Sequence, residues 1–304
     1  MTDPLAGRVL RGDRRAVARA ITRVENGDDS TDLLNGIGKS LGRAFILGLT
    51  GPPGTGKSTL VDRIIAQYRG RKMKVGVIAV DPTSPITGGA LLGDRVRMAQ
   101  HTLDSGVFIR SMASRGWSGG LSGAVSEAIQ ILDAAGMEVV MIETVGIGQS
   151  DIEIMKIAHA VMVVTMPGLG DDVQVSKAGL MEIGDIYAVN KSDLPGADAM
   201  VVNLLSMVRD MKGRSPPVLK VSALKGEGVD RLFDAVEAIR GRFLSPAGEE
   251  MRLRSVRGMI VELAKKKLLS EFEGRAFARS VEVARKVADH KMSYEEAAER
   301  LVDG

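Results

Sequence analysis

The segment Gly51–Thr59 carries the clearest chemistry in this 304-residue chain, because it reads GPPGTGKST. It fits the pattern G-x-x-x-x-G-K-[ST], in which glycines let backbone N–H groups turn inward around phosphate oxygens. An apolar run precedes the segment and a helical run, TLVDRIIAQY, follows it, which is the setting that such a loop requires. We therefore expect the phosphates of a nucleoside triphosphate to bind here.

Two side chains in this loop have expected roles of their own. Lys57 is expected to reach the β and γ phosphates, and the Ser58 hydroxyl is expected to ligate Mg²⁺. The remaining nucleotide contacts in the loop are expected from Gly54, Thr55, Gly56 and Thr59.

A second polar cluster, Asn190-Lys191-Ser192-Asp193, follows the apolar run DIYAVN, at the end of a strand where α/β proteins bind ligands. The Asp193 carboxylate suits the N1–H and exocyclic amine of guanine, a pair of donors that adenine lacks. Asn190 and Lys191 are expected at the base edge and beside the loop. A backbone N–H for guanine O6 is expected from Ser222, Ala223 and Leu224, so the pattern predicts a preference for GTP over ATP.

Carboxylates at other strand ends are candidates for the metal and the triphosphate. Glu143 is the second-last residue of the run MEVVMIET, and Gly146 comes three residues later. Glu143 suits a water on Mg²⁺, and Gly146 is expected to sense the γ-phosphate. Asp81 is a second candidate, although an Asp-Pro turn explains it too. Asp94 lies instead in the glycine-bearing stretch GGALLGDRVRM, which could order over the nucleotide, and it also fits a helix N-cap. Because Ile147 follows Gly146 where a water-orienting glutamine is common, we expect slow intrinsic hydrolysis.

The elements that position these residues are strands and helices in alternation. Almost wholly apolar runs separated by helical ones predict an α/β fold with a mostly parallel central sheet and helices on both faces. Helical spacing at Val9, Leu10, Val17, Ile21 and Val24 predicts an N-terminal helical extension. After the linker-like LSPAGEE we expect a long helical stretch to Glu273 and two shorter ones, the last beginning at Ser293 with a capping box. The expected domains are 1–43, 44–244 and 245–304.

Composition narrows the functional classes. With 41 basic and 38 acidic residues, the net charge of +3 is too small for a nucleic-acid footprint. No apolar run reaches about 18 residues, so no membrane span is expected. The absence of cysteine fits a reducing compartment, and we expect a cytoplasmic protein. Three scattered histidines show no metal-ligand spacing.

Longer strings make the chain resemble the MeaB/ArgK GTPases, accessory proteins of coenzyme B12-dependent methylmalonyl-CoA mutase. They are VDPTSPITGGALLGDRVRM, SMASRGWSGGLS and ETVGIGQSD, and the likeness extends over nearly the whole chain. It implies a P-loop GTPase that gates adenosylcobalamin loading and protects or rescues the mutase. It also implies a homodimer joined by the C-terminal helical arm, with no direct cobalamin binding expected.

The resemblance assigns roles to single residues. Phosphate and magnesium roles fall on Lys57, Ser58, Asp81, Asp94 and Glu143, and guanine recognition falls on Asn190, Lys191 and Asp193. A switch segment is implied at Pro167 to Lys177, with Gln174 and Lys177 as communicating residues. From the residues alone that segment is more simply a strand-to-helix loop, and Arg115, a possible partner contact, lies in what fits a plain glycine-rich loop equally well.

Two other functions compete with the mutase chaperone. One is an ATP-dependent kinase or ATPase linked to amino-acid (LAO/AO) transport, which the NKSD cluster disfavours. The other is a metallochaperone GTPase, which the lack of cysteine and of histidine clusters disfavours. The client mutase, whether for methylmalonyl-CoA, isobutyryl-CoA or ethylmalonyl-CoA, is left open.

Overall fold

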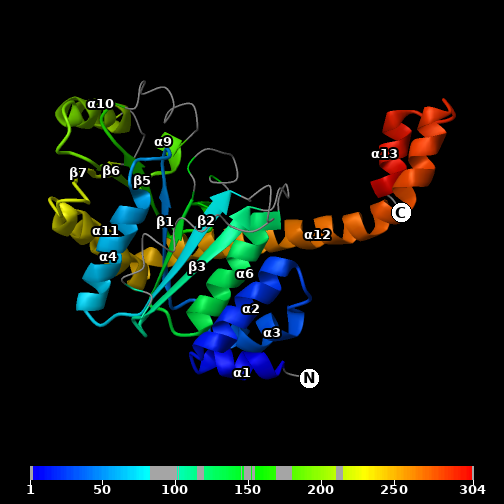
Figure 1. The fold of residues 1–304 in the computed structure, drawn as a ribbon, viewed down its shortest axis with the longest axis horizontal. Coiled ribbons are helices and arrows are strands. Elements are labelled where there is room, and N and C mark those ends of the chain that lie inside the picture. Colours follow the sequence, from blue (N-terminus) through cyan, green and yellow to red (C-terminus); the bar gives the residue numbers. More distant parts are fainter. Residues whose placement is uncertain are drawn as a thin grey trace.

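A single parallel sheet organises the computed structural model (Figure 1). The structure describes residues 3–82, 101, 103–114, 120–144, 146, 152, 155–168, 180–209 and 215–302, without the side chains of 81–82, 113–114, 120–122, 180–181 and 273–279. Its seven strands lie in the order β3-β2-β4-β1-β5-β6-β7. They are β1 Phe45–Thr50, β2 Val75–Pro82, β3 Val107–Ser114, β4 Val139–Glu143, β5 Ala160–Thr165, β6 Ile186–Val189 and β7 Val218–Lys220.

Burial explains the composition of the central strands. Every residue of β1, β4, β5 and β6 is buried, as expected for strands covered by helices on both faces. All six strand pairs are parallel, so the carboxyl ends of the strands meet at one edge of the sheet. The predicted mostly parallel central sheet is thereby confirmed, and the phosphate loop lies after its middle strand, β1.

Two apolar cores lie on opposite faces of the sheet. One core receives α4 Lys57–Gly70 and α11 Val229–Leu244. The other receives α1 Pro4–Leu10, α2 Arg14–Asn26, α3 Thr31–Ile37, α6 Gly120–Ala134 and α10 Ala197–Arg209. A short helix, α9 Leu180–Ile183, precedes β6, and single 3₁₀ turns occupy Gly38–Ser40 and Pro246–Gly248.

The N-terminal helices form the predicted helical extension. The Asp13 carboxylate caps α2 by accepting from the amides of Arg15 and Ala16, at 2.9 and 3.2 Å. Val17 and Ile21 are buried in the same core as α6, so the helical spacing identified a true packing face. Leu10 is an exception, because it ends α1 and stays 41% exposed.

The C-terminal region is organised by one long helix. α12 runs without interruption over Glu249–Ala288, and α13 follows at Tyr294–Val302 (Figure 1). The expected break near Glu273 is therefore wrong: Gly274 lies inside the helix, where one glycine costs only about 1 kcal/mol relative to alanine. The predicted start of the last helix is confirmed, since the Glu296 amide donates to Ser293 Oγ at 3.1 Å.

The first half of α12 is fixed to the sheet domain. Ser255 is fully buried, and its Oγ donates to the Ile157 carbonyl at 2.6 Å. Farther along, Lys266 pairs with Glu127 of α6 at 2.5 Å. The rest of α12, with α13, projects away from the sheet (Figure 1). Across the described residues, no helix has the length and apolarity that crossing a bilayer would require.

Candidate nucleotide-binding site

The phosphate loop connects β1 to α4, and close backbone packing explains its glycines. Gly51 has a φ of 137°, and a Cβ there would lie 1.9 Å from the Val164 carbonyl oxygen. Gly56, the residue before α4, has a φ of 87°, and a Cβ there would lie 2.4 Å from Asn190 Nδ2. Side chains at either position would collide with the neighbouring strand ends, so the loop conformation requires glycine.

The Lys57 ammonium lies against the loop itself. Its Nζ donates to the Gly51 carbonyl at 2.7 Å and to the Pro52 carbonyl at 3.1 Å, and the side chain is buried. The Thr55 hydroxyl also donates to Pro52, at 2.9 Å. A buried cation at the N-terminus of α4 adds to the positive end of the helix dipole, so this end of the sheet favours an anion.

Ser58 and Glu143 meet across the site. The Ser58 hydroxyl, on the first turn of α4, donates to Glu143 Oε1 at the end of β4 at 2.6 Å, and both residues are only 5% exposed. These are oxygen donors of the kind that Mg²⁺ takes from proteins, so the pair fits the ion that the sequence predicts. The backbone of Asp81 lies in β2, next to β4, while its side chain and all of Asp94 lie outside the described residues.

Gly146 is held against the phosphate loop. It has a φ of 89°, and a Cβ on it would lie 1.6 Å from the Gly51 carbonyl oxygen. Gly146 therefore lies at backbone contact distance from the first residue of the loop. A γ-phosphate sensor has to lie next to the phosphate loop, so this contact is compatible with the role predicted for Gly146, which stays a prediction.

Asn190 links the phosphate end of the site to the base end. It is buried, its Nδ2 donates to the Thr55 carbonyl at 2.7 Å, and its Oδ1 accepts from the Ala223 amide at 3.0 Å. The next residue, Lys191, has a φ of 53°, which turns the chain sharply after β6. One carboxamide thus joins three segments, because Thr55 lies 135 residues and Ala223 lies 33 residues from Asn190 in the sequence.

Asp193 presents an ionised carboxylate at the base end. Ser222 Oγ donates to its Oδ1 at 2.8 Å, and Lys225 Nζ lies 3.7 Å from its Oδ2. The Ser222 hydroxyl, together with the Lys225 ammonium, holds the pKa of Asp193 below its usual range. The side chain remains 23% exposed, so it is an acceptor with access to a ligand.

The segment Ser222–Leu224 lies beside Asp193 as the sequence predicts, but its polar groups divide their partners. The Ala223 amide donates to Asn190, while Leu224 is 81% exposed. The carbonyls of Ala223 and Leu224 accept hydrogen bonds from Arg63 of α4, a residue that sequence reasoning missed. No motif marks Arg63, because its partners are backbone atoms far along the chain.

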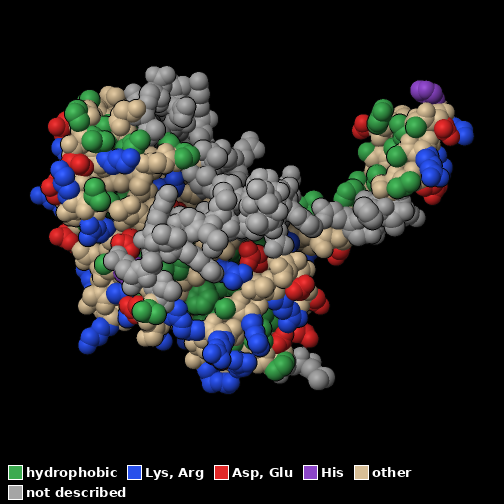
Figure 2. All heavy atoms as spheres, in the orientation of Figure 1, with side chains coloured by type: hydrophobic (Ala, Val, Ile, Leu, Met, Phe, Trp, Pro, Cys, Tyr) green, Lys and Arg blue, Asp and Glu red, His purple; other side chains and the backbone are tan. Residues whose placement is uncertain are grey.

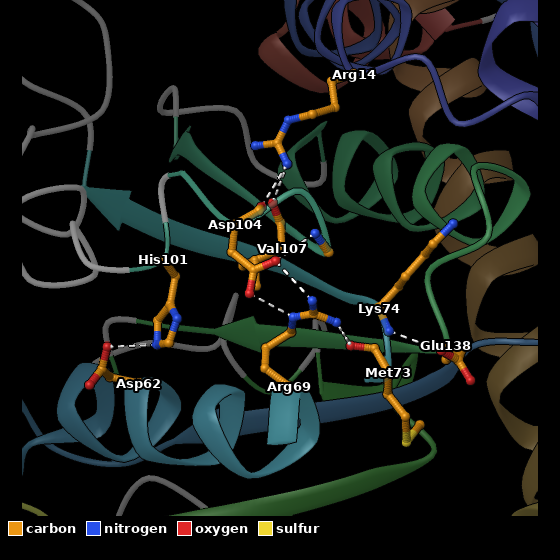
Figure 3. A network of polar contacts seen from close by, with 10 residues as sticks. Arg14, Asp62, Arg69, Met73, Lys74, His101, Asp104, Val107 and Glu138 are labelled. Carbon is orange, nitrogen blue, oxygen red and sulfur yellow. Dashed lines mark hydrogen bonds and ion pairs between the residues drawn. The ribbon is translucent and has the colours of Figure 1, made fainter. Parts of the chain in front are cut away.

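A polar network ties the far end of α4 to the edge of the sheet (Figure 3). Arg69 binds Asp104 through Nε at 2.8 Å and Nη2 at 2.9 Å, and this fork lowers the pKa of Asp104. Arg14 of α2 donates to the carbonyls of Asp104 and Val107. His101 lies 3.2 Å from Asp62 of α4. The helix that begins with Lys57 is thereby held at several points along its length.

The other predicted site residues are the proposed partner and switch positions. Arg115, Gln174 and Lys177 lie outside the described residues, as does Ile147. Their roles stay predictions.

Comparisons with known proteins agree with this geometry. Residues 17–276 match the family described as "Methylmalonyl Co-A mutase-associated GTPase MeaB". A putative GTPase of Pyrococcus abyssi is 48% identical over 278 residues, covering 89% of this chain and 84% of the relative. The GTPase ArgK of Escherichia coli is 38% identical over 241 residues, covering 75% and 73%.

A solved structure extends the likeness to the fold of nearly the whole chain. The structure titled "LAO/AO transport system kinase" superposes with a TM-score of 0.70 at 25% identity, covering 98% of this chain and 95% of the other. The family match, the relatives and the fold all agree with a phosphate loop at the carboxyl edge of the sheet. The chain therefore belongs to the MeaB family of P-loop GTPases.

Proposed function

We propose that this protein is a Mg²⁺-dependent GTPase that acts as a chaperone for a coenzyme B12-dependent acyl-CoA mutase. The preferred client is methylmalonyl-CoA mutase. In this role it gates adenosylcobalamin loading and protects or reactivates the mutase, without binding cobalamin itself. The observation that carries the proposal is the family match over residues 17–276, whose description names the mutase. In this proposal, the GTPase signals to the mutase through a conformational change that the bound nucleotide causes at the site.

The nucleotide part of the proposal rests on the site's own groups. Lys57 binds the β and γ phosphates, exchanging its carbonyl partners on Gly51 and Pro52 for phosphate oxygens. Ser58 and Glu143 would hold the metal, which when bound would neutralise charge that develops on the phosphates. The Glu143 carboxylate would supply an oxygen acceptor to the hydrated ion, as the sequence predicts. Asp81 and Asp94 complete this set as proposals from the sequence.

The base part of the proposal rests on Asp193. Its carboxylate, kept ionised beside Ser222, accepts the N1–H and the exocyclic amine of guanine. Adenine presents an acceptor at N1, so it cannot make this pair of bonds and would leave the carboxylate without donors. This difference favours GTP as the substrate and GDP as the product.

One competing function has a specific observation in its favour. The superposed structure with a TM-score of 0.70 is titled a transport-system kinase, which corresponds to the ATP-dependent alternative. The carboxylate at Asp193 argues against ATP in this chain. The metallochaperone alternative has less support: His159 is buried and accepts from the Ile46 amide, and His101 pairs with Asp62.

The decisive experiment measures coupling between this protein and purified methylmalonyl-CoA mutase. We expect slow GTP hydrolysis by the chain alone, faster hydrolysis with the mutase and Mg²⁺, and tighter mutase binding in one nucleotide state by about 5- to 150-fold. Lys57→Ala is the nucleotide-binding control, and ATP is the substrate control. A lack of both complex and acceleration, with this mutase and with isobutyryl-CoA and ethylmalonyl-CoA mutases, would remove the chaperone role and leave the GTPase family intact.

A further inference from the structure

Arg63 makes an unusual pair of contacts for a surface helix residue. It lies on α4, and its Nε donates to the Ala223 carbonyl at 2.8 Å while its Nη2 donates to the Leu224 carbonyl at 2.9 Å. Within the described residues it forms no ion pair with a carboxylate. Its planar fork is therefore used to hold two consecutive backbone carbonyls, 160 and 161 residues away in the chain.

The held segment is a closed turn from Ser222 to Glu227. The Ser222 amide donates to the Glu227 carbonyl at 2.9 Å, and the Gly226 amide donates to the Ser222 carbonyl at 2.8 Å. The Ala223 amide is used by Asn190. The amides of Leu224 and Lys225 donate to no group in the part of the chain that the structure describes.

Peptide geometry fixes where these two amides point. In a trans peptide, the N–H of one residue points opposite to the C=O of the residue before it. Arg63 draws the carbonyls of Ala223 and Leu224 toward α4, so the amides of Leu224 and Lys225 are directed away from that helix. Gly226 and Gly228 have φ values of 79° and 73°, which leaves this turn conformationally permissive without an anchor.

We infer that Arg63 is a positioning residue for guanine recognition, which aims the amides of Leu224 and Lys225 at guanine O6. The inference rests on the base site at Asp193 proposed above and deepens it. Asp193 reads N1–H and the exocyclic amine, whereas the turn held by Arg63 reads O6. Because α4 also begins with Lys57, one rigid helix sets the distance between the phosphate contacts and the O6 contact.

Preorganisation explains why this anchor matters. When a loop becomes ordered only as its ligand binds, the loss of conformational freedom lowers the affinity for that ligand. Arg63 orders the turn before the base arrives, and Asn190 orders its other side. The same arrangement rejects adenine, because the 6-amino group would face two amide donors.

Nucleotide analogues separate the O6 contact from the Asp193 contacts. Affinities of GDP, 6-thio-GDP and IDP are measured by calorimetry for the full chain and for Arg63→Ala, Arg63→Lys and Gln67→Ala. 6-Thio-GDP has sulfur, a weaker acceptor, in place of the oxygen at position 6, and IDP lacks only the exocyclic amine. Gln67 is the matched control, since it lies one turn farther along α4 and contacts Asp230 of α11 at 2.7 Å instead of the turn.

We expect the wild-type chain to prefer GDP over 6-thio-GDP by about five- to tenfold, the effect of one good hydrogen bond. Arg63→Ala should reduce this ratio to within about twofold while leaving the GDP-to-IDP ratio unchanged. Arg63→Lys cannot bind two carbonyls at once, so its GDP to 6-thio-GDP ratio should lie between those of wild type and Arg63→Ala. The ratio for Gln67→Ala should match wild type.

Three results would overturn the inference. They are an unchanged GDP to 6-thio-GDP ratio in Arg63→Ala, an equal loss of affinity for all three nucleotides, or an equal loss of discrimination in Gln67→Ala. If Arg63→Ala does not fold, Arg63→Lys decides by the same ratio. A wild-type chain that binds GDP and IDP equally would instead contradict the base site at Asp193, which keeps the two failures distinct.

Discussion

At the scale of single residues, the base end of the site depends on one carboxylate whose charge is secured by its neighbours. Ser222 donates to Asp193 at 2.8 Å, and Lys225 lies 3.7 Å away. Both partners favour the ionised form, so the carboxylate is an acceptor at neutral pH. An amide in its place would present one donor and one acceptor, which suits a base that carries an oxygen where guanine has its amine.

Asp193→Asn should therefore shift nucleotide preference from guanine to xanthine. We expect GDP affinity to fall by about 10- to 100-fold, and XDP affinity to rise above it, because the charge-assisted pair of bonds is lost. Competition binding with GDP and XDP measures both effects. Asp198→Asn is the control, since that side chain is 88% exposed on α10 and pairs only with Lys220 in the described structure. An Asp193→Asn chain that keeps wild-type preference would place the base elsewhere.

At the residue level, the motifs predicted which side chains gather at the site, while their roles toward a nucleotide stay predictions. The structure brings Lys57, Ser58, Glu143, Asn190 and Asp193 to the carboxyl edge of the sheet, where the motifs placed them. The contacts of Arg63 were not predictable from sequence, because its partners are backbone carbonyls, which every residue has. The dual use of Asn190, to Thr55 and to Ala223, also requires knowledge of how distant segments meet.

At the scale of elements, the sheet was predictable because burial on both faces requires apolar strands. The runs around Phe45, Val139 and Ala160 are buried throughout, so their composition alone marked them. The continuity of α12 was not predictable in this way. A long charged helix has weak local signals for its end, and packing of its first half on α6 and on Ile157 adds stability that spacing does not show.

His159 illustrates a contact between elements that ties stability to pH. It lies just before β5, its Nδ1 accepts from the Ile46 amide of β1 at 2.9 Å, and its ring packs against the rings of Phe45 and Phe243. Burial, followed by the nearby Arg254 and Arg252, lowers the pKa of His159 to about 3. The folded protein therefore keeps this ring neutral, whereas the unfolded chain binds a proton near the ordinary value of 6.5.

This difference predicts an acid-sensitive component of stability. Below pH 6.5 only the unfolded state gains the proton, so the free energy of unfolding falls by about 1.4 kcal/mol per pH unit as pH drops toward 3. His159→Gln should be less stable at neutral pH and should lose about 2 kcal/mol less than wild type between about pH 7.5 and about pH 5. Urea unfolding at the two pH values measures this.

The control for this prediction is His290→Asn. His290 is exposed and has a φ of 58°, a conformation that asparagine tolerates, so the substitution should leave the pH dependence as in wild type. Equal pH dependence in wild type and His159→Gln would mean that other groups account for the acid sensitivity.

At the scale of the whole molecule, α12 has two unlike faces. Ser255, Glu262 and Lys266 face the sheet domain, where Ser255 and Glu262 are buried. Leu253, Val256, Ile260 and Leu268, at helical spacing, are between 48% and 67% exposed. Farther along the projecting arm, apolar side chains are again visible at its end (Figure 2), where Val281, Tyr294 and Val302 are exposed. An apolar stripe on a projecting helix fits an interface between two copies of the chain.

We propose that two chains pair through this stripe, and Ile260→Asp tests the pairing. In a twofold dimer each substitution acts twice, so losing two buried apolar side chains of about 1.5 to 3 kcal/mol each should weaken association by at least about 100-fold. Val202→Asp on α10 is matched in exposure, at 63% against 61% for Ile260, and lies outside the arm.

Sedimentation at several protein concentrations should then show a wild-type dimer, a Val202→Asp dimer and an Ile260→Asp monomer. A wild-type monomer at every concentration would contradict the pairing.

The first half of α12 contacts the domain that carries the proposed nucleotide site. Ser255 donates to Ile157, in the segment before β5, and Lys266 pairs with Glu127 of α6. In the proposed dimer, each nucleotide-binding domain is connected to the shared interface by its own continuous α12. GDP affinity measured for Ile260→Asp then tells whether pairing and nucleotide binding are coupled.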